Sequence, residues 1–198
     1  MEGMRLRILV LLLSLGALAQ AASQVPFPLD EVPIHEAGEP PHMLPGNIPA
    51  PPKPSKEVID IKKYRGKAVI VAMISMTCGH CVNAVQYLIE IQKEYGPQGL
   101  QVVGVAGDKD AAVNLPGWLQ RFRPNFPFGY LEQAPFLKLS GLPPDGRPFA
   151  PVLLFVDPRG VVRDRKFGND KDMKSSVEGA ILQGTRILMT LSTPLLSK

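Results

Sequence analysis

The feature that most constrains the fold is a continuous apolar run followed directly by two cysteines. The run K-A-V-I-V-A-M-I occupies residues 67–74, and S-M-T-C-G-H-C-V-N-A-V occupies residues 75–85. A short unbroken run with β-branched residues is typical of a strand buried on both faces. Apolar residues then recur at helical spacing, until Gly96 and Pro97 end the pattern. The sequence therefore predicts a buried strand leading into a helix that begins near Cys78.

Further strands and helices follow downstream. The predicted elements are a buried strand at residues 100–105, a helix at 108–121 that Pro116 interrupts, a strand at 151–156, a turn at 157–160, a strand at 161–166 and a helix at 171–191. The early strands alternate with helices and the last two strands form a hairpin. This order predicts an α/β fold, with a central sheet that is flanked by helices and has one antiparallel edge.

Two segments precede this domain, which we place at residues 55–198. Residues 1–21 carry Arg5 and Arg7, an apolar run and small residues in an A-x-A pattern, which predicts a secretory signal peptide. The run is shorter than the roughly 20 apolar residues that span a bilayer, so we expect cleavage, with membrane attachment only if the signal stays uncleaved. Residues 22–54 are rich in proline and predict an extended arm. We therefore expect export to a periplasm or cell envelope.

The whole-chain composition limits the function classes. Cys78 and Cys81 are the only cysteines. A disulfide that closes so short a loop removes little entropy from the unfolded chain, so we expect these cysteines to serve reactivity. The chain has 22 Lys and Arg against 18 Asp and Glu, a net charge of +4. These basic residues are scattered, which gives no support for a nucleic-acid partner.

Two chemistries fit the cysteine motif. In disulfide exchange, Cys78 is the nucleophile because the helix N-terminus favours negative charge, and Cys81, one turn later, is the resolving thiol. His80 can carry a positive charge, which would further stabilise the Cys78 thiolate. That reading needs no cofactor beyond a redox-active Cys78–Cys81 disulfide. In the alternative, the same two sulfurs bind or deliver copper, with Met76 or Met73 adding a thioether. A structural zinc site needs four ligands, and the lack of a second CxxC or a paired histidine downstream argues against one.

Two family resemblances differ in length. Residues 76–85 resemble the M-x-C-x-x-C start of heavy-metal-associated domains. Residues 55–186 resemble the TlpA-like thioredoxins, through Y-R-G-K-A-V-I-V, G-L-Q-V-V-G-V-A-G-D and F-A-P-V-L-L-F-V-D-P-R-G-V-V. The tetrapeptide with Gly79 and His80 between the cysteines is also familiar from protein disulfide isomerases. The longer resemblance implies a thioredoxin fold with a mixed sheet, and an exported thiol-disulfide oxidoreductase.

The TlpA-like resemblance also implies further site residues and partners. Pro151, or Pro148 in another register, corresponds to a cis-proline beside the cysteines, and Ala150 would pair with an extended substrate segment. The partners are protein thiols or disulfides, including apocytochromes in cytochrome maturation, and an upstream electron donor or acceptor. The direction of transfer, reduction or oxidation, stays open.

The sequence departs from the family pattern at two positions near the motif. Thr77 replaces the usual aromatic residue, and Ala72 replaces the buried acid that stands six residues before the first cysteine. Proton transfer from Cys81 therefore needs another group or water, for which Glu132 and Asp157 are candidates.

Overall fold

The structure is a computed structural model that describes residues 33–40, 42–50, 53, 55–142, 151–168 and 185. The predicted signal peptide lies outside the described residues. So does the predicted C-terminal helix, apart from Thr185, which is helical and buried. Among the described residues, no helix combines the length and apolar content needed to cross a membrane.

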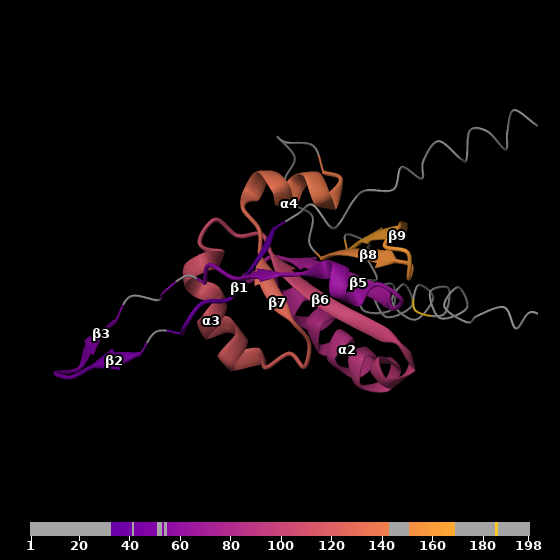
Figure 1. The fold of residues 1–198 in the computed structure, drawn as a ribbon. Helices are drawn as coiled ribbons and strands as arrows, with labels where there is room; N and C mark the ends of the chain where they lie inside the picture. The colour runs from indigo at the N-terminus through magenta and orange to yellow at the C-terminus, as the bar shows by residue number, and fades with distance from the viewer. Residues whose placement is uncertain are drawn as a thin grey trace, which may run out of the picture.

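A seven-stranded mixed sheet forms the centre of the molecule (Figure 1). Its strands, in spatial order, are β4 (Val58–Ile59), β1 (Ile34–Glu36), β7 (Phe128–Tyr130), β6 (Leu100–Ala106), β5 (Ala68–Ile74), β8 (Val152–Val156) and β9 (Val162–Phe167). The three central strands β5, β6 and β7 are parallel, whereas β8, β9, β1 and β4 each pair antiparallel with their neighbours. The predicted α/β class is confirmed.

Both edges of this sheet are antiparallel, where the sequence predicted one. The additional edge consists of the two short strands β1 and β4. Part of the predicted proline-rich arm thus belongs to the sheet, because β1 pairs with β7 and buries Ile34 completely. Three residues are too short a stretch to show strand periodicity. The rest of the described arm includes the hairpin of β2 (Met43–Leu44) and β3 (Ile48–Pro49), which extends away from the sheet in Figure 1.

Strand β5 separates two hydrophobic cores. Every residue of β5 is buried, as its unbroken apolar run predicted, and alternate side chains enter opposite cores. On one face, Ile70 and Ile74 pack with α2 (Gly79–Tyr95) and α3 (Ala111–Phe122). On the other face, Val71 and Met73 pack with the 3-10 helix η2 (Ile61–Tyr64) and α4 (Gln133–Ser140). Figure 1 shows α4 on the opposite side of the sheet from α2.

Helix α3 does not break at Pro116, which corrects the predicted interruption. The helix runs continuously across this proline. A proline removes one helical hydrogen bond and crowds the preceding turn. Here Pro116 is buried, and burial of apolar surface is favourable and opposes that loss. The helix ends as predicted before Pro124, where Arg123 takes a left-handed conformation with φ of 46°.

Candidate active site

The two cysteines lie where β5 ends and α2 begins. Cys78 is the N-cap of α2, and its N–H donates to the Ser75 carbonyl oxygen over 3.2 Å. The Cys78 carbonyl oxygen then accepts from the N–H groups of Cys81 and Val82, at 3.1 and 3.2 Å. The predicted strand-to-helix connection is confirmed. It places Cys78 at the helix end where the first backbone N–H groups have no helical partners.

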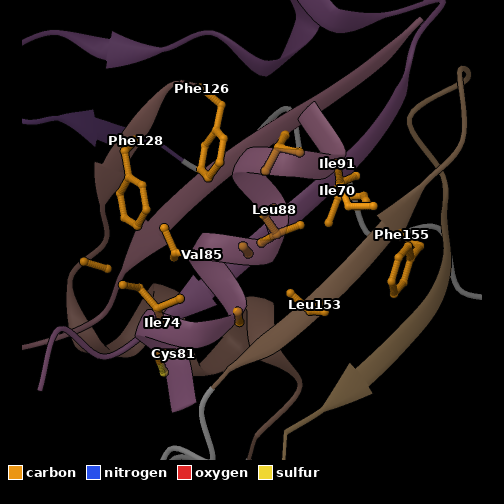
Figure 2. Close-up of a cluster of buried hydrophobic side chains, with 14 of the residues drawn as sticks. Ile70, Ile74, Cys81, Val85, Leu88, Ile91, Phe126, Phe128, Leu153 and Phe155 are labelled. Carbon is orange, nitrogen blue, oxygen red and sulfur yellow. The ribbon is translucent and has the colours of Figure 1, made fainter. Parts of the chain in front are cut away.

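The two sulfurs have different surroundings. Both cysteines carry thiols, but Cys78 is partly exposed whereas Cys81 is 0% exposed. Figure 2 shows the Cys81, Val85 and Leu88 side chains on the side of α2 that faces the sheet. A substrate arriving from solvent therefore meets Cys78 first.

Cys81 is held in its protonated form. Burial raises the pKa of the Cys81 thiol far above its usual value, and a hydrogen bond with the Cys78 side chain and the charge of Asp108 raise it further. A backbone hydrogen bond from Ser75 acts in the opposite direction and does not outweigh them. Cys81 must lose a proton before or while it attacks another sulfur.

Asp108 is the site residue that the sequence analysis missed. Its Oδ1 accepts a hydrogen bond from Ser75 Oγ at 2.8 Å, and its Oδ2 accepts one from the Met76 N–H at 2.8 Å. The available signal was the parallel order of the strands. Ile74 at the end of β5 pairs with Ala106 at the end of β6, so the residues after the two strands meet at one edge.

The two acids named from the sequence lie elsewhere. Asp157 follows β8, which is antiparallel to β5, and Val156 pairs with Val69 at the start of β5. Asp157 is therefore at the opposite end of the sheet from the cysteines and is wrong as a proton acceptor for Cys81. Glu132 is exposed just before α4. The groups that act on the Cys81 thiol in the described part of the chain are Cys78, Ser75 and Asp108.

A hollow of about 690 Å³ opens beside Cys78. It lies between the start of α2 and one side of α3, and its lining includes Cys78 but not Cys81. Val82, Trp118 and Phe122 give it apolar walls, and Arg121 contributes a positive charge. The size and lining fit a short segment of another protein beside the partly exposed sulfur.

The other predicted site residues are spread around the two cysteines. His80 and Gly79 are exposed in the first turn of α2, and a Cβ atom at Gly79 would meet no atom within 4 Å. Pro151 is buried and precedes Val152, whose pairing with Met73 brings Pro151 to the same end of the sheet as the cysteines. Ala150, Pro148 and the peptide bond before Pro151 lie outside the described residues.

The fold separates Met73, but not Met76, from the two cysteines of the copper alternative. Met73 is completely buried in the core on the α4 side, whereas Cys81 belongs to the core on the α2 side. Met76 is partly buried and lines the hollow. Within the described residues, no group of three or more His, Cys, Asp or Glu side chains is arranged to hold a metal ion.

Comparisons with known proteins show similarity at the level of family and fold. The family model described as Redoxin matches residues 50–181. Protein DipZ of Mycobacterium bovis and Protein DipZ of Mycobacterium tuberculosis are each 27% identical over 115 residues. Those matches cover 58% of this chain and 16% of each relative, so the chain spans about a sixth of their length.

Solved structures with the same architecture come from several bacteria. A putative thiol:disulfide interchange protein DsbE from Chlorobium tepidum is 19% identical with a TM-score of 0.54, covering 78% of this chain and 99% of its own. A thiol-disulfide isomerase from Corynebacterium glutamicum is 21% identical with a TM-score of 0.52, covering 81% and 98%. The exposed lipoprotein thioredoxin Etrx1 from Streptococcus pneumoniae is 20% identical with a TM-score of 0.52, covering 67% and 93%. The predicted thioredoxin fold is confirmed.

Proposed function

The chain belongs to the Redoxin family of thiol-disulfide oxidoreductases, and from this premise we propose that it exchanges disulfides with protein substrates through Cys78 and Cys81. The observation that carries the proposal is the difference between the two thiols. Cys78 is partly exposed at a helix N-terminus beside a hollow, and Cys81 is buried next to it with a raised pKa. An attacking thiol needs access, whereas a resolving thiol needs only to reach the first sulfur.

The exchange proceeds in two displacements. The Cys78 thiolate attacks a substrate disulfide, which forms a mixed disulfide and releases one substrate sulfur as a thiol after it takes a proton. Cys81 then loses its proton and attacks Cys78 Sγ, forming the Cys78–Cys81 disulfide and releasing the second substrate sulfur. Two electrons pass from the protein dithiol to the substrate. The reverse sequence oxidises a substrate dithiol, so the same site serves either direction.

The substrate is a protein segment that reaches Cys78 from the side of the hollow. The apolar walls at Val82, Trp118 and Phe122 suit the side chains that flank a substrate cysteine. The backbone at Ala150, before Pro151, is the second proposed contact, where an extended segment adds a strand. The TlpA-like resemblance makes cysteines of exported proteins, including apocytochromes, the proposed substrate class.

Export is part of the proposal. The pattern of residues 1–21 supports it, and the similar Streptococcus pneumoniae structure is that of an exposed lipoprotein. Fractionation of cells that produce the full chain, together with N-terminal sequencing of the product, tests this step. Recovery of the intact chain from the cytoplasm alone would contradict it.

Single-cysteine variants test the redox pair. We expect Cys78→Ser to abolish reduction of a disulfide-bonded protein substrate. Cys81→Ser should instead accumulate a Cys78 mixed disulfide, visible by mass spectrometry, because the first displacement proceeds and the second cannot. Equal activity of Cys78→Ser and the unmodified protein would overturn the proposal. A redox titration of the unmodified protein then assigns direction, since a potential near roughly −270 mV indicates a reductase and one near about −120 mV an oxidant.

A further inference from the structure

The Asp108 carboxylate is held beside the cysteine loop by neutral donors. Ser75 Oγ and the Met76 N–H each donate to one carboxylate oxygen at 2.8 Å. Both donors belong to the loop that connects β5 to Cys78. Within the described residues Asp108 forms no salt bridge, and it is half-buried. The described part of the chain therefore fixes this carboxylate at the site through hydrogen bonds and supplies no ion-pair partner.

The second displacement requires a group of this kind. Cys81 is completely buried and protonated, and its sulfur attacks Cys78 Sγ only once the proton leaves. Asp108 is close enough for its charge to act on the Cys81 thiol. Ala72, Asp157 and Glu132 provide no alternative, because the first has no titratable group, the second lies at the far end of the sheet and the third is exposed before α4.

We propose that Asp108 accepts the Cys81 proton during resolution of the mixed disulfide. This inference rests on the proposed function. As the Cys81 sulfur forms a bond to Cys78 Sγ, its proton passes to the Asp108 carboxylate, directly or through one water, and the bond from Cys78 to the substrate sulfur breaks. The departing substrate thiolate takes up a proton, and Asp108 returns its proton to solvent. The two sulfur bonds and the proton balance without another reactant.

Asp108 also influences the pKa of Cys81. The direction in which the rate of resolution changes when the Asp108 charge is removed therefore distinguishes the two roles. The Asp108 charge also raises the pKa of Cys81, so removing the charge alone would ease ionisation of Cys81 and speed resolution. Loss of a proton acceptor would slow resolution instead. Among the described residues, the charged or titratable groups near this step are Cys78 at the N-cap of α2, exposed His80 and buried Cys81 in its first turn, and exposed Lys109 and Asp110 after Asp108 on its own loop.

The two displacements can be timed separately with dithiobis(nitrobenzoate). In the reduced full chain, attack by Cys78 releases one coloured thionitrobenzoate, at a rate that depends on reagent concentration. Attack by Cys81 on the mixed disulfide releases a second, at a rate independent of that concentration. We expect Asp108→Asn to slow the second phase on the order of 100-fold, the lower part of the range for general base catalysis. The first phase should change by less than about threefold.

Asp110→Asn is the matched control. It removes the same charge two residues away, where the side chain accepts from Asn114 Nδ2 at the exposed start of α3. Both phases should keep their rates in this variant. Ser75→Ala is a second test, because it keeps the carboxylate but removes one of its two donors, and we expect an intermediate slowing of the second phase.

The pH profile separates proton acceptance from a merely structural role. In Asp108→Asn the proton must go to hydroxide, so the second phase should accelerate about tenfold per pH unit, whereas the unmodified protein should show a shallower rise. A second phase that is unchanged or faster in Asp108→Asn overturns the assignment of Asp108 while leaving the redox pair intact. Failure of the unmodified protein to release a second thionitrobenzoate overturns the proposed function itself.

Discussion

Two aspartates at opposite ends of the sheet show how hydrogen-bond and ion-pair partners determine the role of a carboxylate. Asp108 follows β6 and is held by a hydroxyl and a backbone N–H. Asp157 follows β8, is 3% exposed, and accepts from two backbone N–H groups and from Arg163 Nε at 2.7 Å. A carboxylate fixed by an arginine is stabilised as an anion and accepts a proton poorly. No such ion pair holds Asp108 within the described residues.

The contacts of Asp157 stabilise the turn between β8 and β9. Burial by itself would raise the pKa of Asp157, but hydrogen bonds from Val161, Arg163 and Arg159, together with the Arg163 charge, outweigh it and lower the pKa. The same bonds close the turn between β8 and β9, in which the Gly160 N–H also donates to the Asp157 carbonyl oxygen. Asp157 therefore contributes to folding, whereas we assign Asp108 to the reaction.

Removing the Asp157 side chain should give the largest effect on stability. Asp157→Ala leaves the Arg159 and Val161 N–H groups without their acceptor and Arg163 without its ion-pair partner. We expect the free energy of unfolding to fall by about 3 kcal/mol. Urea denaturation measures the loss. In the folded variant, both phases of the dithiobis(nitrobenzoate) reaction should keep their rates.

Asp164→Ala is the control for that variant. Its ion pair with Lys166 is substantially exposed, with side-chain exposures of 34% and 41%, so we expect a loss below about 1 kcal/mol. A slower second phase in Asp157→Ala would contradict the division of roles, because it would connect the far end of the sheet to Cys81.

Some parts of the fold could be predicted from the sequence and others could not. The buried strand and the helix that begins at Cys78 were predicted correctly, because each leaves a local pattern of apolar residues. The uninterrupted course of α3 across Pro116 was not predicted, because the burial that opposes the loss of a hydrogen bond is a tertiary property.

The sequence analysis missed Asp108 for a similar reason. Asp108 is 27 residues after Cys81 in the numbering, and only the pairing of β5 with β6 brings it to the cysteine loop. The direction of β8, antiparallel to β5, is what carries Asp157 away from the cysteines. A reader of the sequence sees two similar aspartates after two apolar strands. Because β6 is parallel to β5 and β8 is antiparallel to it, only the aspartate after β6 lies at the end of the sheet that carries the cysteines.

Acid should weaken the protein through Asp157, with an effect smaller than that of Asp157→Ala. The pKa of Asp157 is lower in the folded than in the unfolded protein, so its contribution to stability is present above the unfolded value of about 3.9 and is lost as pH falls through the folded value. Between about pH 6 and pH 3, we expect the free energy of unfolding to fall by about 1 kcal/mol less in Asp157→Asn than in the unmodified protein. Urea midpoints at the two pH values measure this difference. Equal losses in the two proteins would show that Asp157 is not stabilised as an anion.

The smallest effect is expected at Thr77. Variants at this position test whether hydroxyl groups beyond Ser75 help to hold the Asp108 carboxylate. Ser75 Oγ donates its single proton to Asp108, so Thr77 Oγ1, 3.1 Å from Ser75 Oγ, must be the donor in that contact. Thr77 is exposed, and water can replace its hydroxyl. We expect Thr77→Val to slow the second phase by about twofold and Thr77→Ser, which keeps the hydroxyl, to leave it unchanged. Slowing of more than about tenfold in Thr77→Val would place the hydroxyl chain itself on the proton path. Asp108 would then differ from Asp157 by a relay as well as by the absence of an arginine.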